Sequence, residues 1–260
     1  MEEDFVLERT KRRHALAEIE KLIKKSPNLH IEPSELKAAG ICHLPLSLEG
    51  DTQHRPQFFM PYQEELPFPS KEEENELLER KPNLDFIMWE ARATESFLTS
   101  NFGDCLSYAS DKYPHNPPPS GQYRELGDYR YFGQLLECID FNWYAVEATD
   151  YREGNYPHFK VILESEANGD GRLLRGEIMT ITGIMVGRLR SKRLRPHVVA
   201  PMLVLSLMGP RHARVLEADF DGKILNIRAS KLYDFTQKNT EFVHSLTRYW
   251  LGGACGKTEL

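Results

Sequence analysis

The sequence predicts an α/β protein in which a central mixed sheet is flanked by helices, and three stretches of the chain predict it. Residues 159–163 form a short apolar run rich in β-branched side chains, which is typical of a buried strand. From residue 174 to residue 189, apolar side chains recur at spacings of three and four, which indicates an amphipathic helix of about five turns. Residues 198–208 are apolar almost without a break, as expected of a central strand that is covered on both faces.

Turn signals separate these elements and indicate others. The NGDG stretch at 168–171 is a turn in which Asp170 is a candidate N-cap, and Pro196 ends the helix. An Asp221-Gly222 turn joins residues 214–220 to residues 223–228 as a hairpin. A further helix, strand and helix are expected at 84–108, 141–149 and 240–251. The buried side of the first of these helices is predicted to carry Phe86, Trp89, Ala93 and Phe97.

The N-terminal part of the chain is predicted to be an extension, with an N-terminal helix and a proline-rich strap over residues 1–80 and an α/β domain over residues 81–260. One face of this helix is apolar, through Leu16, Ile19, Leu22 and Ile23. Such a face docks on the main domain, on another copy of the chain or on a protein partner. Nucleic-acid or membrane binding through the basic residues 11–13 is the alternative.

Composition limits the class of protein. With 260 residues, 40% of them hydrophobic and 28% charged, the chain is long enough to bury a substantial core. No run approaches the roughly 18 apolar residues that span a bilayer, and the charged N-terminus lacks the apolar segment of a signal peptide, so no membrane partner is expected. The four cysteines are far apart and form no CxxC pair, which favours a reducing intracellular compartment, cytoplasmic or nuclear.

Charge is unevenly distributed along the chain. The net charge of -6 argues against general coating of nucleic acid, yet residues 172–214 hold nine Lys or Arg against the single acid Glu177. Within this stretch Arg188, Lys192 and Arg195 stand at i, i+4 and i+7, so they are predicted to share one helix face. Such a face is either solvated or in contact with a nucleic-acid backbone.

Two carboxylates, Glu164 and Glu166, close the strand that begins at residue 159, and their spacing of two places both on one face of it. They are solvated strand ends, metal ligands or part of another polar site.

The resulting order is helix, strand, strand with terminal acids, helix, strand, strand. Three groups of residues carry a resemblance over about residues 84–253: the CIDF stretch at 138–141, the VILESE stretch at 161–166, and APMLVLSLMGPRHARVLEADFDGK with the later YDF and RYWLGG. The chain resembles the fungal PD-(D/E)XK nuclease-like proteins, a group of largely unknown role. The resemblance implies a restriction-endonuclease-like core.

The resemblance also implies where chemistry would take place. In that family an Asp and a Glu on neighbouring strands hold Mg²⁺, here Asp140 and Glu164, and a Lys two residues after the Glu orients the attacking water. Glu166 stands where this Lys would be, so the motif is degenerate. Cations that would replace it are Lys160, which precedes Glu164 on the same face of the strand, and Arg172 or Arg175 from the start of the helix.

The expected hairpin bears on which acids meet. If its turn is centred near Gly154, Glu164 pairs opposite about Tyr144, which leaves Asp140 some four residues away unless a bulge intervenes. Glu147 is the local alternative to Asp140.

Three functions remain open. The missing Lys favours a degenerate domain that binds nucleic acid or protein without strong nuclease activity. The first alternative is a Mg²⁺-dependent nuclease in which the 188–195 run contacts phosphates, and the second is a small-molecule enzyme that reuses the cleft beside the sheet.

Overall fold

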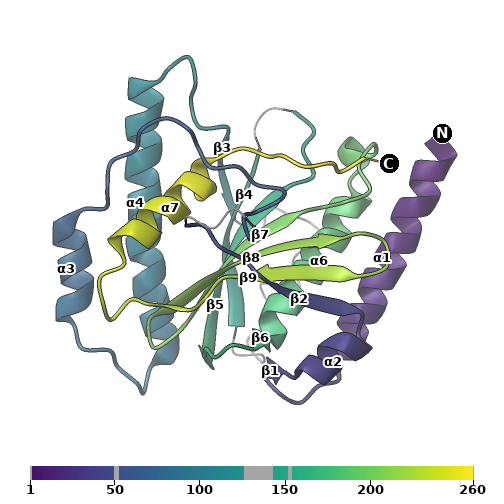
Figure 1. Ribbon diagram of the computed structural model, residues 1–260, viewed down its shortest axis with the longest axis horizontal. Helices are drawn as coiled ribbons and strands as arrows, with labels where there is room; N and C mark the ends of the chain where they lie inside the picture. The colour runs from purple at the N-terminus through teal and green to yellow at the C-terminus, as the bar shows by residue number, and fades with distance from the viewer. Residues whose placement is uncertain (1, 50–52, 126–142, 152–153, 260) are drawn as a thin grey trace.

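The computed structural model describes residues 2–49, 53–125, 143–151 and 154–259 (Figure 1). In this part of the chain eight strands form one sheet, and seven of them follow the order β2-β9-β8-β7-β5-β4-β3. They are β2 (Ile41–Pro45), β9 (Leu225–Ala229), β8 (His212–Phe220), β7 (Met202–Gly209), β5 (Phe159–Asn168), β4 (Trp143–Tyr151) and β3 (Ser120–Glu125), while β10 (Tyr233–Asp234) pairs with β8. The β2–β9 and β5–β7 pairs are parallel and the others are antiparallel, so the predicted mixed sheet is confirmed.

Helices cover both faces of this sheet (Figure 1). One face packs against α1 (Glu2–Lys24) and α6 (Arg175–Arg190), and the other packs against α3 (Lys71–Glu79), α4 (Ile87–Lys112) and α7 (Thr240–Leu251). Short elements complete the fold: β1 (His30–Ile31) pairs with β6 (Leu173–Leu174), α2 (Pro33–Ala38) precedes β2, and a 3-10 turn, η3, covers Lys192–Leu194. The predicted α/β class and N-terminal helix are therefore confirmed.

The central strand β5 shows why its sequence is almost wholly apolar. Val161 and Leu163 belong to the core under α6, whereas Ile162 between them belongs to the core under α4. Both faces of the strand are buried, because successive side chains point to opposite sides. A parallel neighbour, β7, follows after the α6 crossover.

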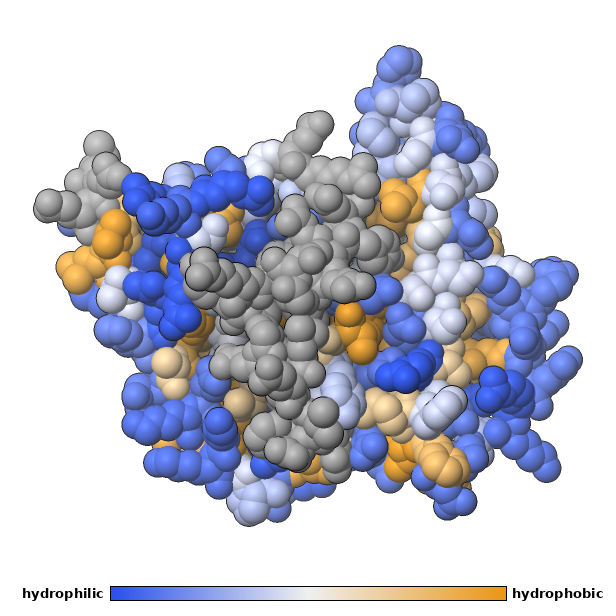
Figure 2. All heavy atoms as spheres, turned by 180° about the vertical axis from the view of Figure 1, so that it is seen from behind, coloured by the Kyte–Doolittle hydropathy of each residue, from blue (hydrophilic) through white to orange (hydrophobic). Residues whose placement is uncertain are grey.

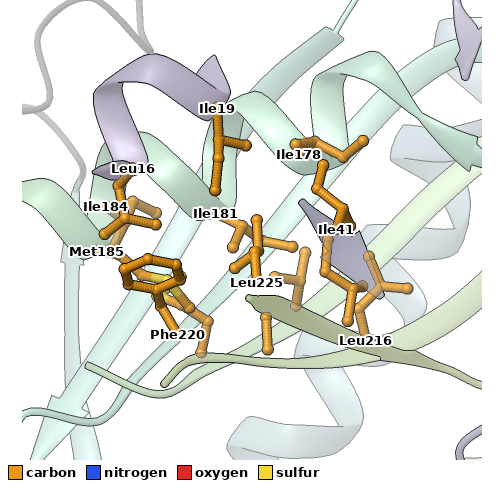
Figure 3. Packing of buried hydrophobic residues seen from close by; sticks show 14 of the residues in the cluster. Leu16, Ile19, Ile41, Ile178, Ile181, Ile184, Met185, Leu216, Phe220 and Leu225 are labelled. Atoms are coloured by element: carbon orange, nitrogen blue, oxygen red, sulfur yellow. The ribbon is translucent and has the colours of Figure 1, made fainter. Parts of the chain in front are cut away.

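The N-terminal segment shares the core of the rest of the chain. Leu16 and Ile19 of α1 pack on Ile181 and Ile184 of α6 (Figure 3), and β2 pairs with β9 at the edge of the sheet. Of the predicted apolar face, Leu22 lies at the surface. Residues 1–80, predicted to be an N-terminal extension, therefore supply both a strand of the sheet and side chains of the core.

Two sequence expectations about helices are wrong. The helix expected to continue toward Pro196 ends at Arg190, and Lys192 then begins η3, so Arg188 shares no continuous helix face with Lys192 and Arg195. In α4, Phe97 is buried as predicted, but Phe86 and Trp89 are exposed. The reason is that the buried side of α4 is centred on Glu90, Ala91, Thr94 and Leu98, and Trp89 points away from that side.

No helix in the ranges that the structure describes is long and apolar enough to cross a membrane. On the face shown in Figure 2, hydrophobic residues are scattered among hydrophilic ones on the coloured surface.

An arginine of α1 ties the first helix to the end of α6. The buried Arg9 guanidinium donates to the carbonyls of Leu189 (2.7 Å), Ser191 (2.9 Å) and His197 (2.6 Å), and to that of Leu194. Leu189 lies in the last turn of α6 and the other three residues follow it, so the cation also complements the negative end of the helix dipole.

Arg9→Ala is expected to lower the free energy of unfolding by about 2–4 kcal/mol, because the carbonyls of Leu189 and His197 lose the donor that Arg9 supplies and those of Ser191 and Leu194 lose one of their two donors. Urea unfolding followed by circular dichroism measures this. Lys11→Ala, an exposed change on the same helix, is the matched control and should change stability by less than about 0.5 kcal/mol. Equal effects of the two changes would contradict a specific role for Arg9.

Candidate functional site

Glu164 lies on β5, on the face of the sheet that α4 covers, and its side chain is only 1% exposed. Arg92 of α4 reaches over from a position that is 60% exposed, and its Nη2 lies 3.4 Å from Glu164 Oε2. Burial raises the pKa of Glu164, and the guanidinium opposes that rise. The acid that closes the predicted strand is therefore an interior carboxylate with a cationic partner.

The neighbouring strand brings a second acid to the same face. Tyr144 of β4 pairs with Glu164, as the expected hairpin register predicts. A bulge between Ala145 and Glu147 then sets Glu147 opposite Ile162. Because directly paired residues point to one side of a sheet, Glu147 faces α4 together with Glu164. Asp140, the predicted metal ligand, lies outside the described residues.

A third acid comes from α4 and was not expected as a site residue. The pKa of Glu95 is raised to about 7, first by burial and then by the carboxylates of Glu147 and Glu164. Burial also raises the pKa of Glu147, and its Oε2 is buried without a hydrogen-bond partner among the described residues. We call Glu95, Glu147 and Glu164 the acidic group.

One sequence signal for this group existed. Arg92 and Glu95 stand three residues apart and so share one side of their helix. This spacing does not predict which strand of the sheet that side of the helix covers.

Lys160 lies on the same sheet face as Glu164, as predicted, but about 13 Å further along the strand by the ordinary rise per residue. It is fully buried, and its Nζ donates to the carbonyls of Tyr249 (2.9 Å), Trp250 (2.6 Å) and Gly252 (2.9 Å). An ammonium has three hydrogens, and all three are used here. Lys160 therefore holds the C-terminal end of α7 and has no donor left for a water or a phosphate.

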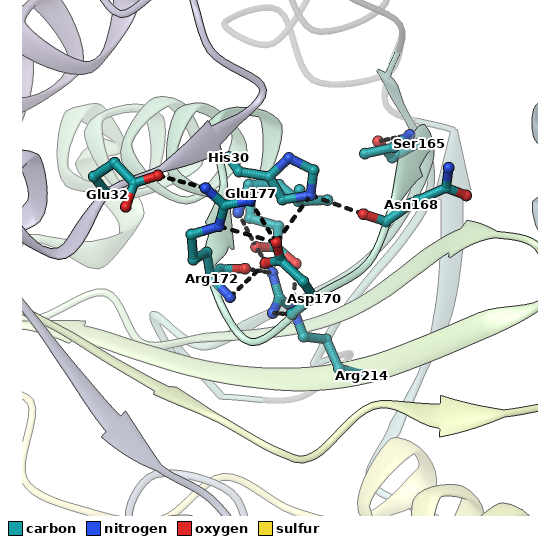
Figure 4. Close-up of polar contacts among 10 residues, drawn as sticks. His30, Glu32, Ser165, Asn168, Asp170, Arg172, Glu177 and Arg214 are labelled. Carbon is teal, nitrogen blue, oxygen red and sulfur yellow. Dashed lines mark hydrogen bonds and ion pairs between the residues drawn. The ribbon is translucent and has the colours of Figure 1, made fainter.

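The other expected cations are engaged elsewhere as well. Arg172 donates to Asp170 (2.6 Å and 2.9 Å) and to Glu32, and this pairing lies beside the buried Glu177–Arg214 pair (Figure 4). Asp170 does not cap α6; its side chain accepts from the Arg172 backbone N–H, and the N-cap position is Leu174. Arg175 donates from Nη1 to the carbonyl of Ser26.

Glu166 is exposed, and it lines a groove together with Trp89, Arg92 and Tyr144. It thus lies at the rim beside the acidic group and is not part of its interior. Arg92 touches both regions, because it lines the groove and pairs with Glu164.

The basic run divides into one buried and two exposed side chains. Arg188 is 7% exposed, pairs with Asp150 at 3.3 Å and donates to the carbonyls of Tyr156 (2.8 Å) and Pro157 (3.2 Å). Lys192 and Arg195 are exposed on and after η3. Of the three residues predicted to contact phosphates, Lys192 and Arg195 are therefore accessible to a phosphate group.

The donor chemistry of the acidic group suits Mg²⁺, which prefers carboxylate oxygens, but its present arrangement does not. Arg92 holds Glu164, and within the ranges described no three His, Cys, Asp or Glu side chains are arranged to hold a metal ion. The described residues therefore do not form a complete ligand set for Mg²⁺.

Comparison with known proteins gives no relative: no family model, no curated protein and no solved structure matches the chain. The site is thus interpreted from its own geometry.

Lys160→Met is expected to destabilise the fold by about 2–4 kcal/mol, since three buried carbonyls at the end of α7 lose their donor. Thermal unfolding measures the loss, and Lys192→Met, an exposed change, serves as control. Unchanged stability of the Lys160 variant would show that the ammonium does not hold α7.

Glu95→Gln is expected to stabilise the protein at pH 8 by on the order of 1 kcal/mol, less than the full pKa shift implies because the carboxyl is partly exposed and screened. The folded-state pKa lies above the ordinary 4.5, so the stability contributed by the protonated acid is complete below pH 4.5 and lost as the pH rises through about 7. Urea unfolding from pH 4 to pH 8 should show the difference between wild type and variant growing over that window. A pH-independent difference would contradict the assignment, and Glu18→Gln on the exposed side of α1 is the control.

Proposed function

We propose that the chain is a degenerate PD-(D/E)XK-like, restriction-endonuclease-like domain that acts as a binding module without strong nuclease activity. The observation that carries this proposal is the contact between Arg92 and Glu164. The acid that a nuclease would offer to a metal is held by a guanidinium instead.

Metal-dependent hydrolysis of a phosphodiester requires free carboxylate oxygens for the metal and a cation near the developing phosphate charge. Lys160 is fully occupied at the end of α7, and Glu166 occupies the position of the missing Lys. Glu147 lies next to Glu164, and Glu95, whose pKa is raised to about 7, adds a partial negative charge at neutral pH. A phosphate that approaches this region meets mostly like charge, which opposes both binding and hydrolysis.

Binding of a protein is better supported than binding of nucleic acid. Arg188 is engaged in the interior with Asp150, which leaves Lys192 and Arg195 of the predicted phosphate-contacting set. With Arg190 and Arg193, four exposed cations remain in the 188–195 run, and one of them, Arg193, lies 3.8 Å from Asp150, so the run offers few phosphate contacts to a nucleic-acid backbone. The intracellular location expected from the cysteines is part of this proposal, and Cys42, Cys105 and Cys255 are free thiols.

A Mg²⁺-dependent nuclease remains the second candidate, and one observation favours it. Three acids from α4, β4 and β5 converge, and the Glu147 Oε2 is buried without a hydrogen-bond partner among the described residues. Arg92 is more than half exposed, so its side chain can leave Glu164 without disturbing the core. Mg²⁺, if bound, would supply Lewis-acid activation of water, and Glu147 and Glu164 are the described residues that would contribute ligands once Arg92 has left, although they do not complete the set.

Incubation of the purified protein with single- and double-stranded DNA and RNA, with Mg²⁺ or Mn²⁺, distinguishes the two candidates. We expect the wild type to cleave no faster than Glu164→Ala, which removes the buried acid. Arg92→Ala, which frees Glu164, tests whether the guanidinium alone suppresses activity. Cleavage by the wild type that needs the divalent ion and disappears in Glu164→Ala would refute the binding-module proposal and establish the nuclease.

A further inference from the structure

A groove of about 460 Å³ opens where α4 begins and β5 ends. Figure 1 shows the start of α4 and the end of β5 at the lower side of the view. The residues that line the groove include Phe86 and Trp89 at the start of α4, Tyr144 of β4 and Glu166 of β5. The groove adjoins the acidic group through Arg92, which contacts Glu164.

The rim of this groove is unusually apolar for an exposed surface. Leu84 is 68% exposed, Phe86 is 57% exposed and Trp89 is 70% exposed, and all three line the same groove. Single exposed apolar residues are ordinary, whereas a contiguous group that includes a Trp and a Phe is typical of an interaction surface. Burial of a Trp side chain against a partner is among the largest single contributions to binding.

The charge of the groove selects the partner. Asp85 and Glu166 are exposed in its lining, and Arg92 is the basic side chain among the lining residues. The remaining acidic group, Glu95 and Glu147, lies close behind. A cationic ligand is therefore attracted, whereas the phosphates of a nucleic acid meet like charge at the rim.

Arg92 itself shows that this end of the sheet accommodates a guanidinium beside a buried carboxylate. An arginine or lysine from outside would find two kinds of contact. Its cation would lie over the face of the Trp89 ring, and its hydrogens would reach Asp85 or Glu166 at the rim. An apolar side chain next to it in the partner would cover Leu84 and Phe86.

We infer that this groove binds a segment of a partner protein in which basic and apolar side chains alternate. The inference rests on the proposed function as a binding module and names the chemistry of its partner.

The test uses the full chain and a fluorescein-labelled synthetic peptide of alternating arginine and leucine, with binding followed by fluorescence anisotropy. We expect saturable binding that weakens as salt is added, and no binding of the matched peptide of alternating glutamate and leucine. Trp89→Ala and Glu166→Lys should each weaken binding about tenfold or more. Leu7→Ala and Glu18→Lys, exposed changes on α1, are the matched controls and should leave the affinity within about twofold.

Tryptophan emission gives a second readout. Trp143 and Trp250 are buried, so the exposed Trp89 should account for a blue shift when the basic peptide binds. Circular dichroism of Trp89→Ala confirms that the variant is folded, because an exposed side chain contributes little to the core.

Absence of peptide binding, or equal binding by wild type and Trp89→Ala, would overturn the inference. So would an oligothymidylate that binds in a Trp89-dependent manner and displaces the peptide, since the groove would then be a nucleic-acid site. A different result would contradict the proposed function, namely nucleic-acid cleavage that depends on Glu164. Loss of peptide binding without such cleavage removes only the inference about the partner.

Discussion

The structure depends on a central strand that carries two charged side chains while both of its faces are buried. Lys160 and Glu164 of β5 are each at most 1% exposed, and an unpaired charge in such a place costs several kcal/mol. Each therefore needs a partner of its own. The carbonyls at the end of α7 accept the hydrogen bonds of Lys160, whose pKa burial lowers, and Arg92 of α4 forms an ion pair with Glu164. The hydrogen bonds of Lys160 place the end of α7 over one end of β5, and the ion pair of Glu164 places α4 further along the strand.

Buried arginines obey the same rule elsewhere in the fold. Arg9 satisfies the carbonyls that follow α6, Arg214 pairs with Glu177 inside the sheet-helix interface, and Arg211 pairs with Glu90. A guanidinium offers five donors in a fixed plane, so one side chain can satisfy several acceptors that a helix end leaves open. The positive charge of the 172–214 stretch is thus partly used in the interior, which is why a count of basic residues overstates the cationic surface.

Periodicity and turn chemistry were sufficient to predict a mixed sheet, its central strands and the Tyr144–Glu164 register, but not the edge strands β2 and β3. They did not predict the partners of individual side chains. Glu95 was assigned to no site, because its role arises only when α4 lies across β5 and β7, which brings Glu95 near Glu164 of β5 and Glu147 of β4. Lys160 had the right parity for the site, but its distance along the strand and its three carbonyl acceptors depend on a helix about 90 residues later. Trp89 was placed on one stripe with the buried Phe97, but the buried side of α4 is centred on Glu90, Thr94 and Leu98, so Trp89 points away from the sheet.

The position of Glu166 connects these observations to function. In a nuclease-like motif a Lys at this position would bring positive charge toward a phosphate; here a carboxylate stands at the rim, beside an exposed Trp and two exposed apolar side chains. If the chain is a degenerate member of that family, as proposed, a carboxylate at this position lacks the positive charge that hydrolysis needs and attracts cations to the surface. Arg92 pairs with the buried Glu164. The exposed carboxylates of the groove, Asp85 and Glu166, then remain accessible to a cationic ligand. Under the proposed function, the absence of strong nuclease activity and the binding of a cationic partner both follow from the negative charge at Glu166.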